Sequence, residues 1–513
     1  MALAQVSVFE GSFSLAAAEA VLDLPHIDVP GIALDVLQGL VEKSLVRRRP
    51  DTRFDMLVSL REYASEHLRT VGRYPGSGPD ALDAASTRHA SYFARFKEAD
   101  ARASASADLD NFVAACRYSV ECHHVQQAVE TLEVSWAALR LRGPFSICLE
   151  LCEHVRARLD LDKRDGARVD RIRGWALRVL GRRAEALEAL QRALSDASNV
   201  GDTAIAARVH SQLGDVFMVS GDVEAARRQL DTALRLSRDI GDACLECEVL
   251  GHRGNVCEAV GELGRARSDY AAQLALARAM ADRRLEAASL GNLGTLFANQ
   301  GKIEDALESY QAALAIERDI GSRQLEGDTL CNLGLLRQVQ GNFEEARRCL
   351  LAALSLARDM GYARLGAVVM CNLGIVEEAM DRTEDARKSY RGALRAAREI
   401  GDKRFEGQCL TFLGGLDART GDLKAADASL TEAERLLTAV SDRLSLGLLH
   451  CFRAEASYLM GDNEVGQKRL RMASAVASEL GAEATSELGV ALARVGRLVG
   501  GVASRSNLNS TNS

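Results

Sequence analysis

Proline, aromatic residues and long apolar runs are all scarce in this chain. No proline follows Pro144, and aromatic residues make up only 5% of the sequence. Because proline interrupts helix interiors, its absence from most of the chain favours one helix after another. With so few aromatic side chains, the core has to be formed mainly by leucine, alanine, valine and isoleucine. No apolar run in the sequence is long enough to cross a bilayer.

The chain also lacks an excess of positive charge. Its formal net charge is −8, so the composition gives no electrostatic footprint for nucleic acid or an anionic membrane. The N-terminal stretch MALAQVSVFEG has no basic start and carries Glu10 early, unlike a signal peptide. The 12 cysteines lie in a long helical chain, where we expect reduced thiols. These features predict a cytoplasmic protein without a membrane partner.

What the chain has in abundance is internal repetition. The stretch CNLGLLRQVQGNFEEARRCL at residues 331–350 returns forty residues later as CNLGIVEEAMDRTEDARKSY and stands forty residues earlier as GNLGTLFANQGKIEDALESY. The leading glycines at this interval are Gly174, Gly214, Gly254, Gly294, Gly334, Gly374 and Gly414. Each is followed seven residues later by one of Gly181, Gly221, Gly261, Gly301, Gly341, Asp381 and Gly421. Paired alanines follow in nearly every unit. Such a regular interval indicates a repeat architecture.

Each unit has the features of a helical hairpin. The leucine before the leading glycine belongs to the buried stripe of a first helix, and the glycine lets a neighbouring helix approach closely. The second glycine ends that helix, and the alanines permit tight packing of a second helix. A single hairpin cannot bury its apolar face, so stacked hairpins are expected to form a solenoid.

This order of leucine-glycine, glycine and two alanines resembles the tetratricopeptide repeat over residues 161–500, as about eight units of forty residues. The usual unit of that family has 34 residues and closes its second helix with proline. Here arginine occupies that place, for example Arg358, and Gly361 is expected to end the longer helix. The resemblance implies an all-α, right-handed α-solenoid.

The N-terminal part has a different pattern. Two short helices in LAQVSVFEGSFSLAAAEAVLDL, a third in ALDVLQGLVEKSLV, a hairpin from SLVRRR to RFDML and the helix VSLREYASEHL are expected. These phrases resemble the winged-helix module of STAND-class regulatory ATPases, and RHASYFARF and LDNFVAACRYS resemble the helical linker that follows it. We therefore predict a winged-helix-like domain at residues 1–75, a helical linker at 76–160 and a disordered tail at 501–513.

Two departures from that family bear on activity. Met56, Leu57 and Val58 stand where many relatives carry a Met-His-Asp motif that senses the nucleotide. No GxxxxGK[ST] phosphate loop occurs in the chain, so no ATP site of that kind can form from it. Either an ATPase core lies upstream or in a separate chain, or the repeats work alone. No catalytic motif is present, and we predict no enzyme activity and no cofactor.

Two other groups of residues could carry function. The basic run Lys43, Arg47, Arg48, Arg49 and Arg53 could be a DNA-contacting wing, but an intramolecular contact or a solvated hairpin fits an acidic chain better. The cysteines and histidines are expected to bind no metal, because four zinc ligands must converge and these lie in separate helical clusters. The candidates are Cys244 and Cys247, and Cys122, His123, His124, Cys148, Cys152 and His154.

The most specific functional signal is a row of polar side chains. Asn292, Asn332 and Asn372 stand two residues before successive leading glycines. In the tetratricopeptide family this place faces the concave groove, and the resemblance implies contact with a bound peptide, whose N–H and C=O groups an amide can match. The alternative is that the asparagines only bond between adjacent helices. Further candidates for the groove are Gln212, His252, Asn255, Asp328, Gln338 and Gln408.

These observations favour a non-catalytic scaffold or sensor module that binds a protein or peptide segment in its groove and belongs to a STAND-like signalling protein. A DNA-binding regulator, with a winged helix and ligand-sensing repeats, is the second hypothesis. An enzyme regulated by its repeats would need a catalytic domain outside this sequence.

Overall fold

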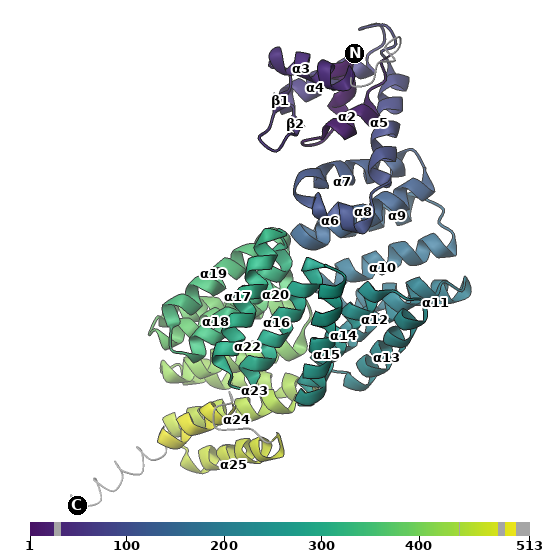
Figure 1. Ribbon diagram of the computed structural model, residues 1–513. Coiled ribbons are helices and arrows are strands. Elements are labelled where there is room, and N and C mark those ends of the chain that lie inside the picture. Colours follow the sequence, from purple (N-terminus) through teal and green to yellow (C-terminus); the bar gives the residue numbers. More distant parts are fainter. Residues whose placement is uncertain (25–31, 441, 481–487, 499–513) are drawn as a thin grey trace, which may run out of the picture. The chain divides into compact units, whose positions relative to one another are not determined.

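The computed structural model describes residues 1–24, 32–440, 442–480 and 488–498, which form helices and one small sheet (Figure 1). The chain divides into two units, described separately here. The first comprises Met1–Glu326 with Asp359–Gly361, and the second comprises Gly327–Arg358 with Tyr362–Ser513. The predicted tail at residues 501–513 lies outside the described residues. In the part that is described, no helix is both long and apolar enough to cross a membrane.

The first unit begins with short helices and a hairpin. The elements are α1 (Ala2–Gln5), a 3-10 turn (Val6–Val8), α2 (Leu15–Val21), α3 (Ile32–Glu42), β1 (Arg47–Arg48), β2 (Phe54–Asp55) and α4 (Val58–Arg69). Strands β1 and β2 pair antiparallel, with Arg47 opposite Asp55. The helices, the hairpin and the closing helix appear in the order expected from the sequence. That they form a winged helix stays a prediction.

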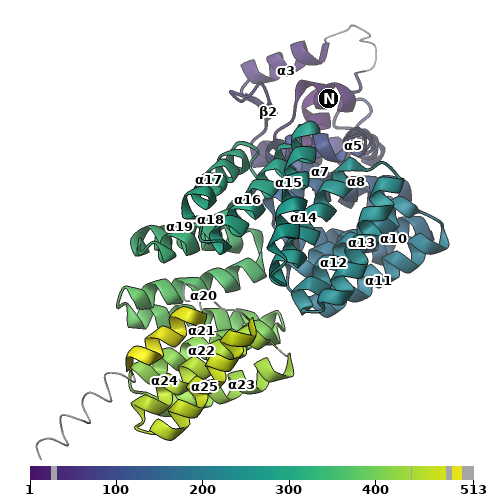
Figure 2. The same cartoon turned by 60° about the horizontal axis from the view of Figure 1, so that its bottom comes forward.

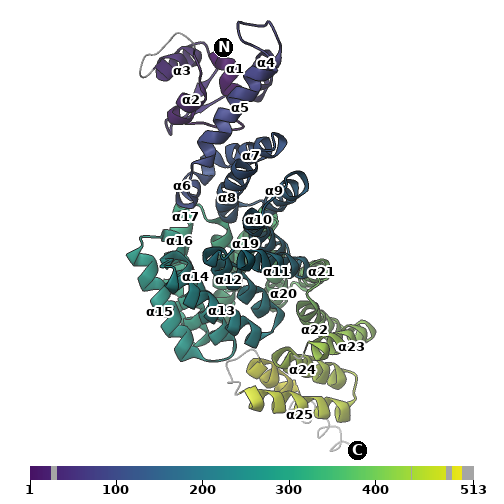
Figure 3. The same ribbon diagram turned by 90° about the vertical axis from the view of Figure 1, so that its right-hand side faces the viewer.

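Five helices follow, and the first four of them share an apolar core with this N-terminal part. They are α5 (Pro79–Ala94), α6 (Glu98–Ala103), α7 (Ala105–Glu121), α8 (Val125–Arg142) and α9 (Phe145–Arg158). Figure 3 shows α5 running from the N-terminal helices to α7 and α8. One apolar core contains Phe9 and Phe13 from the N-terminal part and Phe93 and Phe112 from α5 and α7. These helices and the N-terminal part therefore share their buried surface.

Polar contacts reinforce this packing. The guanidinium group of Arg53 forms an ion pair with Asp108 of α7 and donates to the Ser12 carbonyl at 2.8 Å. Asn111 of α7 donates to the same carbonyl at 2.9 Å. In the hairpin, Arg47 pairs with Asp55 at 2.8 Å. Arg47 and Arg53, two of the five basic residues considered as a DNA-contacting wing, thus have partners within the chain.

The remaining helices form consecutive hairpins, each made of a first and a second helix (Figures 1 and 2). The first helices are α10 (Lys163–Val179), α12 (Thr203–Ser220), α14 (Ala243–Ala259), α16 (Arg283–Asn299), α18 (Arg323–Val339), α20 (Ala363–Ala379), α22 (Lys403–Arg419) and α24 (Arg443–Leu459). The second helices are α11 (Arg183–Asn199), α13 (Val223–Asp239), α15 (Leu263–Ala279), α17 (Ile303–Asp319), α19 (Phe343–Met360), α21 (Thr383–Glu399), α23 (Leu423–Ala439) and α25 (Asn463–Leu480). A further helix spans 488–498. The predicted all-α solenoid of hairpins is confirmed.

At the leading glycine the two helices of a hairpin are in close contact. A β-carbon on Gly214 would lie 2.5 Å from Leu230 Cγ, and one on Gly254 would lie 2.3 Å from Tyr270 Cε1. Leu230 and Tyr270 are fully buried at the same place of successive second helices. The close approach expected at the leading glycine is therefore confirmed, and its partner is a large leucine or tyrosine side chain.

The second glycine ends the first helix. Gly221 follows α12 with φ 81° and ψ 2°, a left-handed conformation that glycine adopts without a steric penalty. Asp381, which stands at this place in a repeat without the second glycine, also has a positive φ of 57°. Asp222 then caps α13, because its side chain accepts a hydrogen bond from the Ala225 amide at 2.9 Å.

We predict that Gly254→Ala lowers the free energy of unfolding by about 1–3 kcal/mol, because the new methyl group must displace the buried Tyr270 ring. Gly264→Ala in α15 is the matched control. Nothing lies within 4 Å of its added methyl group, so the better helix propensity of alanine should leave stability unchanged or raised by up to about 1 kcal/mol. Urea unfolding followed by circular dichroism checks both variants. Equal stabilities would contradict the packing described here.

Candidate functional site

A pocket opens on the first helices of the first unit. It is lined by α8, α10, α12 and α14, with α6 and the preceding Lys97 contributing to one wall, and its volume is about 300 Å³. That volume is at the lower end for ligand pockets in proteins. Helices α10, α12 and α14 contribute because the forty-residue register places their corresponding faces side by side, whereas α8 precedes the repeats. Helix α6 comes from the linker and therefore breaks the pattern.

Charged side chains line much of this pocket. Lys97, Arg102, Arg140, Arg171, Arg178 and Arg208 are basic, and Glu98, Asp215 and Glu248 are acidic. In a chain with a net charge of −8, this local excess of basic groups is the reverse of the overall balance. The electrostatic character of the pocket therefore suits an anionic group.

Glu248 is the central acidic group of the pocket. Its carboxylate lies 2.9 Å from Arg140 and 2.5 Å from Arg284. Burial alone would raise the pKa of Glu248, but the positive charges of Arg140 and Arg284 outweigh it and hold that pKa well below its usual range. Glu248 thus remains ionised at neutral pH and holds α8, α14 and α16 together.

Arg171 has weaker compensation for its burial. Only 3% of the residue is exposed, and its nearest carboxylate, Glu133, lies 3.7 Å away. Glu133 is itself held at 2.6 Å by Arg168. Burial lowers the pKa of Arg171, although the charge of Glu133 opposes the shift. The guanidinium group instead lies over the ring of Trp136, 4.6 Å from its centroid.

Two residues that line the pocket carry buried polar atoms without a hydrogen-bond partner among the described residues. Trp136 is 3% exposed, and its indole Nε1 has no hydrogen-bond partner among the described residues. The Oε1 atom of Gln212, which also lines the pocket, is buried and without a partner in the same part of the chain. Buried polar atoms are usually bonded, so these two are available to a ligand or to water.

Two residues predicted from the sequence lie in this pocket. Gln212 of α12 and His252 of α14 both line it. The Nδ1 atom of His252 shares a hydrogen bond with Ser211 Oγ at 3.2 Å. The predicted row therefore brings these two side chains to one cavity. Whether they contact a ligand stays a prediction.

Asn292 and Asn255 are engaged within the array. Asn292 of α16 occupies the same repeat place as His252, and its amide donates to Gln273 Oε1 of α15 at 3.3 Å. Asn255 is exposed and accepts a hydrogen bond from the Tyr270 hydroxyl at 2.7 Å. These bonds between adjacent helices are the kind that the alternative interpretation expects, and they leave the contact with a peptide untested.

The other predicted residues belong to the second unit. Asn332 and Asn372 lie on α18 and α20, and both are half-buried. Asn372 donates to Cys331 Sγ at 3.6 Å. Gln408 of α22 donates to Ser445 Oγ of α24 at 2.8 Å. Two more residues, Asp328 and Gln338, are half-buried on α18, and the buried Oε1 atom of Gln338 has no partner among the described residues.

Sequence reasoning missed Trp136, Trp175 and Arg171. One signal for Trp175 was present, because it stands directly after a leading glycine where other repeats carry Asp215 or Asn255. No other repeat carries an aromatic residue at this place, so the ring marks an exception in the array. The contribution of Lys97 and Glu98 had no such signal, because neither belongs to a repeat.

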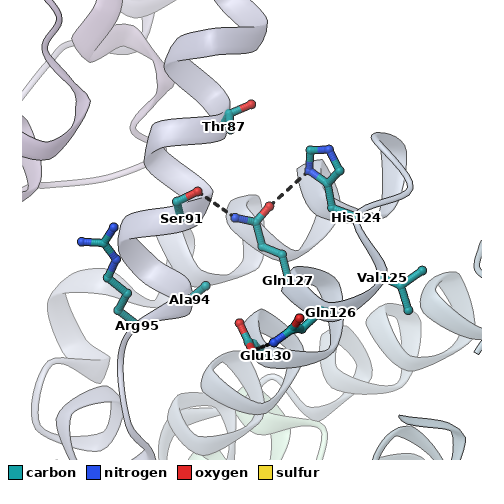
Figure 4. Close-up of a pocket in the computed structure, with 9 residues that line it drawn as sticks. All are labelled: Thr87, Ser91, Ala94, Arg95, His124, Val125, Gln126, Gln127 and Glu130. Atoms are coloured by element: carbon teal, nitrogen blue, oxygen red, sulfur yellow. Dashed lines mark hydrogen bonds between the residues drawn. The ribbon is translucent and has the colours of Figure 1, made fainter. Parts of the chain in front are cut away.

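A second, more open hollow lies between α5 and the start of α8, with a volume of about 730 Å³. Its polar side chains largely bond to one another (Figure 4). Gln127 donates to Ser91 Oγ at 3.0 Å and approaches His124 at 3.4 Å, and Gln126 donates to Glu130 at 2.9 Å. Since these groups have partners, this hollow is a weaker candidate than the pocket on the first helices.

The cysteines have the environment of core residues. All 12 are free thiols. Burial raises the pKa of Cys244 to about 11 and that of Cys247 to about 12. A thiol must ionise to bind zinc or to act as a nucleophile, and Cys247 instead donates to the Gln273 carbonyl at 3.3 Å. Within the ranges that the structure covers, no group of three or more His, Cys, Asp or Glu side chains could hold a metal ion.

We predict that Glu248→Gln lowers the free energy of unfolding at about pH 7 by about 1–3 kcal/mol, because it leaves Arg140 and Arg284 without their anion. Since the folded pKa of Glu248 is depressed, its contribution is present above the ordinary glutamate pKa of about 4.3 and is lost as the pH falls. The difference from wild type should therefore shrink at about pH 3.5.

Urea unfolding at both pH values measures this effect. Glu246→Gln on the same helix is the matched control. Glu246 pairs at 2.7 Å with Arg238, whose side chain is 57% exposed, and such pairs contribute about 0–1 kcal/mol. A Glu248→Gln variant no less stable than the Glu246→Gln variant would contradict the role given to Glu248.

Comparison with known proteins identifies the repeats. The tetratricopeptide repeat family matches residues 245–319, 325–399 and 367–439. No match was found among curated proteins. Many solved structures are similar. One is a STAND protein with a tetratricopeptide repeat sensor from Pyrococcus horikoshii, with 17% identity and a TM-score of 0.44, and the match covers 87% of this chain and 64% of that one. The chain thus spans less than two thirds of that protein.

Two further structures are similar over nearly their whole lengths. The quorum sensor NprR from B. thuringiensis has 16% identity and a TM-score of 0.45, and the match covers 72% of this chain and 98% of that one. A Rap protein complexed with competence and sporulation factor has 14% identity and a TM-score of 0.43, with 66% and 99% covered. At these identities the likeness concerns the fold alone. The family match thus shows tetratricopeptide repeats at residues 245–319 and 325–439 of this chain.

Proposed function

We propose that the repeat array binds a peptide or an extended protein segment along its first helices. The observation that carries this proposal is the pocket on α8, α10, α12 and α14, in which the predicted residues Gln212 and His252 meet. Asn292 continues the same repeat place on α16, and Asn332 and Asn372 do so in the second unit. A row of amides can bond to the backbone of a ligand without requiring one sequence.

The array would serve as a sensor or scaffold arm of a signalling protein. The N-terminal phrases that resemble the winged helix and linker of STAND-class ATPases support this role, as does the absence of a phosphate loop from this sequence. A nucleotide-binding core would then be supplied upstream or by another chain. Ligand binding would act on that core through α5 to α8, which share an apolar core with the N-terminal helices.

DNA binding by the hairpin has less support. Arg47 and Arg49 both face Asp55, at 2.8 Å and 3.9 Å, and Arg53 is paired with Asp108. These contacts occupy three of the basic side chains that a DNA-binding wing would present to phosphates.

We predict that a peptide selected from a random display library binds the purified chain, and that the variant with Asn292→Ala, Asn332→Ala and Asn372→Ala binds it at least about 10-fold more weakly, since the ligand backbone loses three amide partners. Fluorescence anisotropy of the labelled peptide measures the affinity. Asn199→Ala with Asn342→Ala, at two exposed positions of the array, is the matched control.

Circular dichroism should show nearly unchanged helicity and melting for both sets of variants. If no peptide is selected, or if the triple variant binds as tightly as the control, the proposed function is wrong. Unfolding of the triple variant would mean that the asparagines serve only the packing of the helices.

A further inference from the structure

An apolar residue stands at one repeat place where each second helix ends. In successive repeats this place holds Val200, Ile240, Met280, Ile320, Met360, Ile400 and Val440. Val200, Ile240 and Val440 are exposed, as a residue at a surface turn usually is. Met360 at the end of α19 is instead fully buried, with 0% of the residue exposed. Another part of the chain therefore covers Met360 and leaves its counterparts uncovered.

The turn between α8 and α9 provides this cover. A β-carbon on Gly143, which lies in the turn, would be 2.9 Å from both the Cα and the Cβ atom of Met360. Gly143 also has a positive φ of 66°, so glycine is required at this position for two reasons. By their contacts, Asp359–Gly361 belong to the first unit, although the rest of α19 belongs to the second. The linker thus packs directly against the end of α19.

A second contact joins the end of α8 to the array. A β-carbon on Gly321, in the turn between α17 and α18, would lie 3.1 Å from Nη1 of Arg142. Arg142 directly precedes Gly143, and a cation is favourable near the C-terminal end of a helix such as α17. The last residues of α8 and the turn after it therefore meet two successive turns of the array.

The junction between α19 and α20 lacks an ion pair that recurs elsewhere in the array. At other junctions an arginine near the end of the second helix pairs with a glutamate of the next first helix. The pairs are Arg238–Glu246 at 2.7 Å, Arg278–Glu286 at 3.1 Å, Arg318–Glu326 at 2.9 Å and Arg398–Glu406 at 2.8 Å. In α19, Arg358 stands at the same place, but Gly366 replaces the glutamate.

A helix cap is also missing at this junction. Asp242, Asp282 and Asp402 each precede a first helix, and their side chains accept a hydrogen bond from one of its backbone amides. Tyr362 takes this place before α20, and its side chain forms no such cap. The α19–α20 junction has thus lost two polar contacts that stabilise other junctions.

We propose that the turn between α8 and α9 is a clasp on the α19–α20 junction, in place of the missing ion pair and cap. The linker, rather than the array alone, then controls how firmly α19 and α20 are held together. Leu141, two residues before Gly143, is buried in the apolar core that also contains Phe9. A displacement of the N-terminal helices therefore reaches this junction through α8, without passing along the intervening repeats.

Oxidation of Met360 tests the clasp directly. The probe is dilute hydrogen peroxide, and mass spectrometry of peptides locates the methionine sulfoxide. Because oxidation requires access to the sulfur, Met360 in the wild-type chain should react about 10-fold or more slowly than Met460, which is 48% exposed. Gly143→Ala forces the turn away from α19, so it should speed the oxidation of Met360 several-fold and leave that of Met460 unchanged.

Gly201→Ala is the matched control. Gly201 also follows a second helix and has a positive φ of 69°, but nothing lies within 4 Å of its added methyl group. This substitution therefore imposes similar backbone strain without displacing a neighbour. It should leave the oxidation of Met360 as slow as in the wild-type chain.

Hydrogen-deuterium exchange measures how firmly the junction is held. Gly143→Ala should speed amide exchange several-fold in the last turn of α19 and the first turns of α20. Adding Gly366→Glu gives Arg358 the carboxylate that other junctions have, and it has room because the new β-carbon would lie 3.8 Å from Ala357 Cβ. The double variant should recover slow exchange while Met360 still oxidises quickly. Gly366→Gln, which brings no charge, should not recover it.

The proposal is overturned if Met360 oxidises as fast as Met460 in the wild-type chain, if Gly143→Ala acts no differently from Gly201→Ala, or if Gly366→Glu recovers no more than Gly366→Gln. Should Gly143→Ala unfold the chain, Met360→Ala takes its place. It should speed exchange at the junction more than Ile240→Ala speeds exchange at its own junction, and equal effects would also overturn the proposal. These measurements use no ligand, so their outcome is independent of the proposed function.

Discussion

The close approach at the leading glycine is the constraint on which the array depends. At Gly214, Gly254 and Gly374 the missing side chain makes room for a large buried residue of the second helix, either a leucine or a tyrosine. Any larger residue at the glycine would push the two helices apart. Because the same contact recurs every forty residues, each hairpin adopts nearly the same geometry, and stacking then places corresponding faces of the first helices beside one another.

Because the hairpins stack regularly, residues at the same repeat place come to lie on one surface. Residues at one repeat place, such as Gln212 and His252, arrive at one pocket because α12 and α14 are equivalent elements. Around Glu248, an arginine of the array on α16 meets an arginine of the linker on α8. The pocket differs from the rest of the array in two places. One is Trp175, which follows a leading glycine, and the other is α6, which comes from the linker. The regular positions thus supply the scaffold and the row of polar side chains, and the irregular positions distinguish the pocket from the rest of the array.

Much of the fold could be predicted from the sequence, and less of the site. The glycines at Gly221 and Gly361 marked helix ends correctly, because a left-handed residue has few alternatives to glycine. The row of polar residues predicted that Gln212 and His252 lie on the same face of successive first helices, because periodicity fixes which side chains share a side of a helix. The contacts of Arg171, Trp136 and Glu98 depend on the path of the linker, which obeys no repeat. Neither periodicity nor composition carries that information.

The central claim is that ligands bind to the first helices of the array. Hydrogen-deuterium exchange of the full chain, with and without a library-selected peptide, tests it most directly. The account predicts slower exchange in the first helices α12, α14 and α16 on binding, with little change in the second helices α13 and α15. Protection confined to the second helices, or to the N-terminal helices alone, would contradict it.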